Sequence, residues 1–223
     1  MAAGQRYKFQ GSEIKVLTGF DAESPGVPIS GITKTNPARV TYTGGDLVQN
    51  GDIIRIAADS VVGMTEVNGG VYIVDNVDTG TNKFDLFEVD ATGYGTYVSG
   101  GSFDVGAFSN LCELTNYNRQ GGTSPEIPAT TICSTAQEYE LGLPDFGTTQ
   151  LSFNFAPCTT VQSALHQFYL SGGIMAVKVI LPNGGAELTQ MGFVQQESET
   201  AGVGGLWTAQ TTIKNTGDRY DIC

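Results

Sequence analysis

The clearest periodic pattern in the chain predicts an α-helix at residues 160–171. Its apolar positions recur every three or four residues, at Val161, Ala164, Leu165 and Phe168. This spacing places apolar side chains on one face of a helix, which can then pack against a core. Thr159 or Thr160 can cap the first turn, and Gly172 is suited to end the helix.

Runs rich in β-branched and aromatic residues predict strands over most of the remaining chain. One group lies in the first half, at 38–43, 52–57, 71–76, 84–89 and 94–99. Gly-rich and Asn-Gly turn signals separate these runs, as they do between antiparallel strands. A second group follows at 136–143, 148–155, 174–181, 187–196 and 206–215. Because short strands dominate both groups, the chain is predicted to be mainly β.

The most informative strand pair is predicted at 136–143 and 148–155, joined by a turn at 144–147 that contains Pro and Gly. In the second strand, polar residues alternate with Leu151, Phe153 and Phe155. Alternation of this kind is typical of a strand with one buried face. The opposite face is predicted to be wet and acidic, with Glu138, Glu140, Thr148, Gln150, Ser152 and Asn154. The apolar face needs a cover, so we expect a β-sandwich or rolled sheet flanked by one helix.

Composition changes near residues 25–28 and 100–106, where Gly, Pro and small polar residues gather. We interpret these two places as the ends of an insertion. Residues 28–104 are therefore predicted to form a small antiparallel β-barrel or sandwich, of which we favour the barrel. It would be inserted into a discontinuous domain formed by residues 1–27 and 105–223.

Charge restricts the partners of the chain. Among 223 residues, 23 Asp and Glu outnumber 11 Lys and Arg, which gives a formal net charge of −12. Because proteins bind duplex DNA through clustered Lys and Arg, this balance argues against tight DNA binding. The sequence contains no apolar run of about 20 residues that would predict a membrane span, and residues 1–10 carry no apolar signal core. We therefore expect synthesis in a cytosol and no membrane partner.

Four cysteines stand at scattered positions, Cys112, Cys133, Cys158 and Cys223. With a single histidine, His166, they cannot form an ordinary Cys/His metal cluster. We expect reduced and mostly packed thiols, with Cys223 the most exposed.

Candidate catalytic groups are few. Any Ser/His/Asp or Cys/His constellation would have to use His166, and its place on the predicted helix favours a surface or structural role. Glu138 and Glu140 share a strand face and could act as paired carboxylates of a carbohydrate-active enzyme, although a solvated acidic face is the simpler explanation. The Gly-rich segments lack the Lys and Ser/Thr of a phosphate-binding loop. We predict a protein that is not an enzyme, with no catalytic residue, cofactor or metal.

Residues 110–146, NLCELTNYNRQGGTSPEIPATTICSTAQEYELGLPDF, resemble the major tail tube proteins of long-tailed, non-contractile bacteriophages, chiefly in the acidic EYELGLPD pattern. The resemblance continues through 160–171 and the closing TTIKNTG of 211–217. Separately, 29–102 resembles a small β-domain of phage virion proteins that is similar to a region of ubiquitin-activating enzymes. No ubiquitin chemistry is implied, because the first cysteine is Cys112.

The first resemblance implies a structural virion protein of the tail, assembled in the host bacterial cytoplasm as stacked hexameric rings. Hairpins of neighbouring subunits would join into one β-barrel and so remove their exposed edges. The acidic or neutral lumen would conduct DNA into the host without tight binding. The resemblance also implies tape-measure, tail terminator and tip proteins as partners, and a place on the tube exterior for the inserted domain.

Two site assignments follow from the resemblance. The six polar residues of the predicted hairpin face are assigned to the channel wall. The loop at 115–131, with Pro125, Ile127 and Pro128, is assigned to contacts with the adjacent ring, the alternative being a disordered surface loop. A rival interpretation is a phage surface decoration or adhesin module whose inserted β-domain binds host glycans. The acidic hairpin with its LGLPDF turn favours the tail tube, because a domain that only anchors a glycan-binding module does not need such a hairpin.

Overall fold

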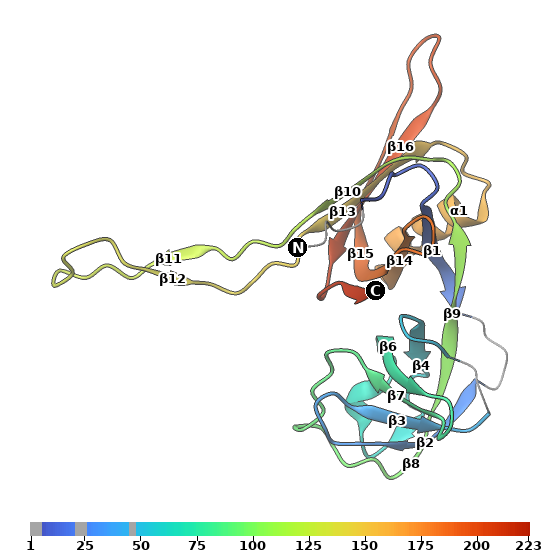
Figure 1. Ribbon diagram of the computed structural model, residues 1–223, viewed down its shortest axis with the longest axis vertical. Coiled ribbons are helices and arrows are strands. Elements are labelled where there is room, and N and C mark those ends of the chain that lie inside the picture. Colours follow the sequence, from blue (N-terminus) through green and yellow to red (C-terminus); the bar gives the residue numbers. More distant parts are fainter. Residues whose placement is uncertain (1–5, 21–25, 45–47) are drawn as a thin grey trace. The chain divides into compact units, whose positions relative to one another are not determined.

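The computed structural model describes residues 6–20, 26–44 and 48–223 (Figure 1). Parts of the predicted discontinuous domain (1–5 and 21–25) and of the predicted insertion (45–47) lie outside the described residues. The described chain is mainly β, as predicted, and it divides into two compact units. Unit 1 comprises Met1–Leu111, Ala176–Thr189 and Arg219–Cys223, and unit 2 comprises Cys112–Met175 and Gln190–Asp218. The insertion boundaries at 28 and 104 stay a prediction, because unit 1 contains them both.

Six strands of unit 1 form the small antiparallel barrel expected between residues 28 and 104. In order around the barrel they are β2 (Val27–Ile32), β3 (Arg39–Tyr42), β7 (Lys83–Leu86), β6 (Val71–Asp78), β4 (Ile53–Ile56) and β9 (Ser102–Asn110). β9 also pairs with β2, which closes the barrel. Its core contains Tyr42, Phe84 and Phe103, three buried rings with centroids 5.4 to 5.7 Å apart. Burial of large apolar side chains drives this closure.

The prediction of a strand at 94–99 is wrong. The regular structure there is β8 (Ser99–Gly100), paired with β5 (Val61–Val62), and a short 3-10 helix (Thr65–Val67) lies nearby. The Gly95 N–H donates a hydrogen bond to Glu66, and the Tyr97 hydroxyl donates to the carbonyl of Ile29. These tertiary contacts hold the segment as a loop, and aromatic composition alone could not reveal them.

The rest of unit 1 continues from the barrel without a break. β9 extends to pair with β1 (Glu13–Phe20), which pairs with β14 (Ile174–Ile180). The first residues of β15 (Glu187–Thr200) pair with β17 (Tyr220–Ile222). Lys178 of β14 is buried between Asp52 and Glu187, with nitrogen–oxygen distances of 3.1 and 3.0 Å. Lys178 thus joins the barrel loop that carries Asp52 to β15, through partly buried polar contacts.

A second such contact lies at the end of the chain. The Tyr220 hydroxyl donates a hydrogen bond of 2.6 Å to Asp75, and its ring packs edge-on against Phe87. Burial raises the pKa of Tyr220, and the bond to Asp75 raises it further. Tyr220 therefore stays a neutral hydrogen-bond donor at physiological pH.

Unit 2 is an open antiparallel sheet with one α-helix beside it. Its strands run in the order β10 (Leu114–Gln120), β13 (Thr148–Asn154), β16 (Thr208–Asn215) and the distal part of β15. The predicted alternation is confirmed, because Leu151 and Phe153 of β13 are buried between half-buried polar neighbours. The strands expected at 174–181, 187–196 and 206–215 are also present, with ends that differ by a few residues.

The predicted helix is confirmed as α1 (Thr160–Ser171). The Thr159 side chain accepts a hydrogen bond from the Gln162 N–H, and Gly172 ends the helix in the left-handed region with φ of 64°. The buried positions of α1 are Val161, Gln162, Ala164 and Leu165, while Phe168 is half-buried.

The predicted pairing of 136–143 with 148–155 is wrong. β12 (Tyr139–Leu141) pairs with β11 (Glu126–Pro128), whereas β13 pairs with β10 and β16. Two glycines, Gly122 and Gly147, allow the chain to pass close to itself at both sides of this segment. A Cβ on Gly122 would lie 1.8 Å from the Asp145 carbonyl oxygen, and one on Gly147 would lie 2.1 Å from that of Gln120. The result is a longer hairpin with its base at these glycines.

Candidate assembly surfaces

One face of the unit 2 sheet consists almost entirely of uncharged polar side chains. Residues opposite one another on antiparallel strands lie on the same face, as in the row Asn118, Gln150, Thr212 and Gln196. We call the following set the neutral face: Asn116, Asn118, Gln120, Thr148, Gln150, Ser152, Asn154, Gln196, Ser198, Thr200, Thr208, Gln210, Thr212 and Lys214. Lys214 is the charged member of the set, and the apolar Phe193 lies opposite it on the same face. This face therefore offers water many hydrogen bonds but little fixed charge.

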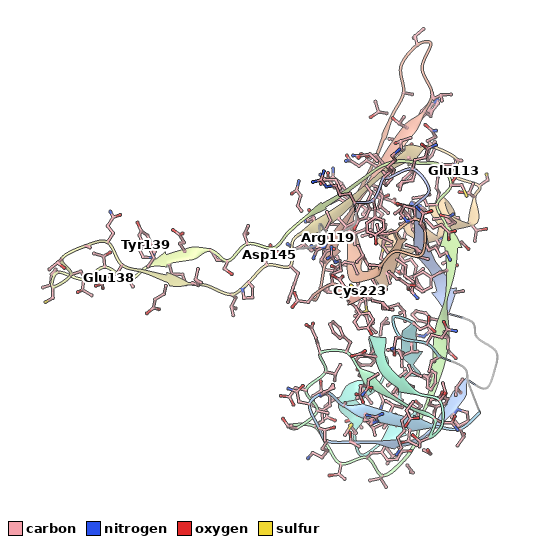
Figure 2. The ribbon with its side chains drawn as sticks, in the orientation of Figure 1. Glu113, Arg119, Glu138, Tyr139, Asp145 and Cys223 are labelled. Atoms are coloured by element: carbon pink, nitrogen blue, oxygen red, sulfur yellow. The ribbon has the colours of Figure 1, made fainter. Side chains whose placement is uncertain are left out.

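Residues 121–147 form a long hairpin, which we call the arm (Figure 1). All of these residues are described, and none of them is buried. The arm exposes a set of large apolar side chains, Ile127, Ile132, Tyr139, Leu141 and Leu143. It also carries Glu126, Glu138 and Glu140 but no Lys or Arg. Its surface is therefore apolar and acidic together (Figure 2).

The base of the arm is tied to the sheet by an ion pair. The Lys214 amino group donates to both carboxylate oxygens of Asp145, at 2.5 and 2.6 Å, and the Gly147 N–H donates to Asp145 at 2.7 Å. The hydrogen bond from Lys214 lowers the pKa of Asp145 below its ordinary value, and the bond from Gly147 adds to this effect. Asp145 is thus held as a carboxylate where the arm leaves the sheet.

The sheet of unit 2 is open. β10 stands at the end of its strand order, so one of its edges has no strand partner among the described residues. An unpaired edge presents backbone N–H and C=O groups that can pair with another chain. The neutral face, the arm and the β10 edge together form the candidate assembly surfaces.

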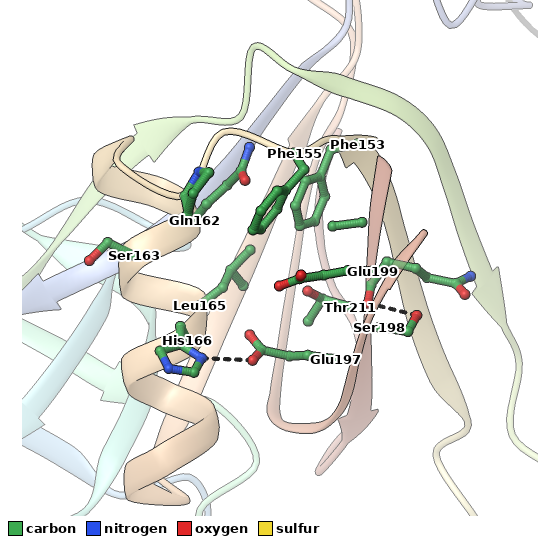
Figure 3. A pocket seen from close by; sticks show the side chains of 13 residues that line it. Phe153, Phe155, Gln162, Ser163, Leu165, His166, Glu197, Ser198, Glu199 and Thr211 are labelled. Atoms are coloured by element: carbon green, nitrogen blue, oxygen red, sulfur yellow. Dashed lines mark hydrogen bonds and ion pairs between the residues drawn. The ribbon is translucent and has the colours of Figure 1, made fainter. Parts of the chain in front are cut away.

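A cleft of about 230 Å³ lies between α1 and the other face of the sheet (Figure 3). Phe153, Phe155 and Leu165 supply its apolar wall. Its carboxylates are Glu197 and Glu199 of β15, and the Nδ1 of His166 of α1 lies 2.9 Å from the Glu197 carboxylate. We call it the acidic cleft.

The structure separates the six residues predicted to share one hairpin face. Thr148, Gln150, Ser152 and Asn154 lie together on the neutral face. Glu138 and Glu140 lie on the arm instead, because β12 pairs with β11. The prediction of a wet acidic face on this sheet is therefore wrong, since the acids of the predicted hairpin belong to another strand pair.

The segment assigned to inter-ring contacts is not a loop throughout. Its first part is strand β10, and Ile127 and Pro128 belong to β11, with Pro125 just before that strand. All three residues are exposed on the arm. Sequence reasoning placed them on an exposed segment but missed the strand that presents them.

The cysteine prediction is wrong in one respect. Cys112, Cys133, Cys158 and Cys223 are free thiols, but all four are exposed rather than packed. His166 is an exposed side chain bonded to Glu197, as expected for a surface histidine. Within the described ranges, no group of three or more His, Cys, Asp or Glu side chains could hold a metal ion. Nor does any helix there have the length and apolar character needed to cross a membrane.

Comparison with known proteins gives structural likeness alone. No family model matches the chain, and no curated protein matches its sequence. A chain from the tail of an empty gene transfer agent particle, refined with C6 symmetry, is 13% identical, with a TM-score of 0.42 over 52% of this chain and 87% of that chain. A chain from the virion of a native gene transfer agent particle is 14% identical, with a TM-score of 0.42 over 52% and 89%. A chain from the baseplate of the anti-feeding prophage is 8% identical, with a TM-score of 0.36 over 81% and 97%.

Proposed function

We propose that the chain is a structural subunit of a phage tail tube, which polymerises as stacked, hexameric rings around a channel for DNA. The neutral face carries this proposal. It is a broad polar surface on an open sheet, with α1 beside the opposite face. The sequence resemblance to major tail tube proteins points in the same direction. In this function the protein acts in the virion and catalyses no reaction.

The neutral face suits the wall of a channel through which DNA must slide. A wall rich in Lys and Arg would release counterions from the phosphates and hold the DNA, whereas a strongly acidic wall would repel it. Amide and hydroxyl groups do neither, because they carry no net charge. The one cation of the face, Lys214, is neutralised by Asp145. In this proposal Glu138 and Glu140 lie on the arm and not in the channel wall.

The open edge and the arm supply the contacts between copies. Pairing of β10 with a strand of the next subunit would extend the sheet around the ring. The arm, including Pro125, Ile127 and Pro128, would cover its exposed apolar side chains on a neighbouring subunit. Surfaces that combine exposed apolar side chains with polar ones are typical of protein interfaces.

Electron microscopy of the purified chain at increasing concentration tests the proposal, with light scattering to give the mass of soluble species. We expect rings or hollow tubes with a channel as wide as duplex DNA. A closed dimer or trimer that buries the neutral face would contradict the proposal.

A double substitution separates assembly from folding. Leu141→Ser with Leu143→Ser removes two arm side chains that are 77% and 89% exposed, so we expect an unchanged unfolding midpoint and at least tenfold weaker polymerisation. Val62→Ser with Val98→Ser, which changes two exposed apolar residues of unit 1, is the matched control and should leave polymerisation unchanged. Equal polymerisation by both variants would exclude the arm from the contacts.

A further inference from the structure

The acidic cleft has the size and chemistry of a receptor for side chains. Its volume of about 230 Å³ is below the roughly 300–1,000 Å³ of sites that enclose small-molecule ligands. An aromatic wall beside carboxylates favours a cation with an aliphatic stem, which can lie along the rings while its charged end meets an acid. Arg and Lys side chains have this form.

The two acids of the cleft have a defined spacing. Glu197 and Glu199 are two residues apart on β15, so both point toward the same side of the strand, and Figure 3 shows both at the cleft. Along a strand this separation is about 6.5 Å. A segment with two cations two residues apart, bound in an extended form, matches it.

The chain itself contains such a segment near its N-terminus. Most of its Lys and Arg side chains are engaged with acids or with Gln190. Among the described residues, the cations without such a partner are Arg6, Lys8, Lys34 and Lys83. Arg6 and Lys8 form the pair two residues apart, and both are exposed. Tyr7 between them lies against Gly185 of its own unit, since a Cβ on Gly185 would be 2.7 Å from the Tyr7 ring.

We propose that the acidic cleft binds the N-terminal segment Arg6–Phe9 of a second copy of this chain. Arg6 and Lys8 pair with Glu197 and Glu199, and their aliphatic stems lie along Phe153 and Phe155. Tyr7 keeps the segment anchored to the copy that donates it. This inference adds a specific contact to the self-assembly proposed above and rests on it.

A peptide-binding experiment tests the contact apart from assembly. The probe is a synthetic peptide of residues 1–10, MAAGQRYKFQ, added to the full chain with Arg6→Ala and Lys8→Ala so that its own segment does not compete. The chain has one tryptophan, Trp207, whose ring lies 6.0 Å from that of the cleft residue Phe155. Because the peptide has no tryptophan, fluorescence of Trp207 reports binding directly. We expect a saturable change, weakened by added salt.

Substitutions in the cleft decide whether the acids are responsible. Glu197→Gln and Glu199→Gln should each weaken peptide binding about threefold, and together about tenfold, as for partly exposed ion pairs. Asp218→Asn makes the same charge change at an exposed position of unit 2 outside the cleft and the arm, and should have no effect. Equal affinity for the cleft variants and the control, or equal binding of a peptide with alanine at positions 6 and 8, would overturn the proposal. The far-ultraviolet dichroism of each variant verifies that α1 and the sheet remain folded.

A dilution series identifies which copy supplies the segment. The Trp207 emission of the natural chain should differ from that of the Arg6→Ala, Lys8→Ala variant at high concentration and coincide with it on dilution. A difference that persists at every dilution would mean that the segment occupies its own cleft, which also overturns the proposal. Peptide binding without rings or tubes would refute the tube function and retain the contact. Tubes without peptide binding would support the tube function and overturn the proposed contact.

Discussion

The barrel of unit 1 and the sheet of unit 2 are both antiparallel, but they treat their edges in opposite ways. In the barrel, each of six strands pairs on both sides, and the large rings of Tyr42, Phe84 and Phe103 are buried. In unit 2, β10 ends the strand order and the arm exposes Leu141 and Leu143. The barrel is complete in one copy of the chain, whereas unit 2 keeps backbone and apolar groups available for another copy.

The two regions also differ in how they use charge. Ion pairs of the barrel and its surroundings lie between strands and loops of the same unit, as for Arg55 with Asp104 and Lys178 with Asp52. Unit 2 also has a pair of this kind, Lys214 with Asp145, but its neutral face lacks acids, and most of its acids lie on the arm or in the cleft. Charge therefore helps to hold unit 1 together and, in our proposal, directs contacts between copies in unit 2.

The sharpest way to test this comparison is to remove one ring from the barrel core. Phe103→Ala should lower the free energy of unfolding by about 3–5 kcal/mol, because it leaves a cavity beside Tyr42 and Phe84. Denaturant titration followed by circular dichroism measures the loss. Leu143→Ala on the arm is the control and should change stability by less than about 0.5 kcal/mol, since Leu143 is exposed. Comparable losses for both would mean that the arm is packed in the dissolved chain.

A smaller effect is expected from the buried cation of unit 1. Lys178→Met leaves Asp52 and Glu187 without their shared cation, and it should cost about 2 kcal/mol in urea unfolding. This is below the usual cost of breaking a buried pair because both carboxylates are about one quarter exposed. Lys15→Met, which removes the half-buried partner of the exposed Glu13, should cost less than about 0.5 kcal/mol. If both variants lost the same stability, Lys178 would have no special part in joining the barrel loops to β14.

Local sequence signals predicted those parts of the fold that local interactions determine. The helix was predicted with its correct ends, because its apolar spacing and its caps, Thr159 and Gly172, are all close in sequence. The buried face of β13 was also predicted, since alternation shows which side chains face the core. Alternation does not show which strand lies next to which. The pairing of 136–143 was therefore wrong, and so was the acidic character of the sheet face.

Some signals of the true arrangement were present in the sequence. Gly122 and Gly147 bracket the arm, and both allow a close approach of backbones that any side chain would prevent. The spacing of Glu197 and Glu199 could also have marked a site. The two acids line a cleft only because α1 lies beside β15 and Phe155 reaches the same cleft. Neither arrangement follows from residues close in sequence.

The smallest effect concerns the ion pair at the base of the arm. Lys214 lowers the pKa of Asp145 below its ordinary value of 3.8, so the carboxyl binds a proton less readily in the folded protein than in the unfolded chain. Its contribution to stability is therefore present above pH 3.8 and is lost as the pH falls through the lower folded pKa. Asp145→Asn removes the titrating group, so its stability should fall less steeply than that of the natural chain between about pH 4 and pH 2. Glu140→Gln, on the arm, should keep the natural slope. Urea midpoints measured across this range give the slope of stability against pH. Equal slopes for Asp145→Asn and the natural chain would show that the Lys214 pair does not hold the arm in solution.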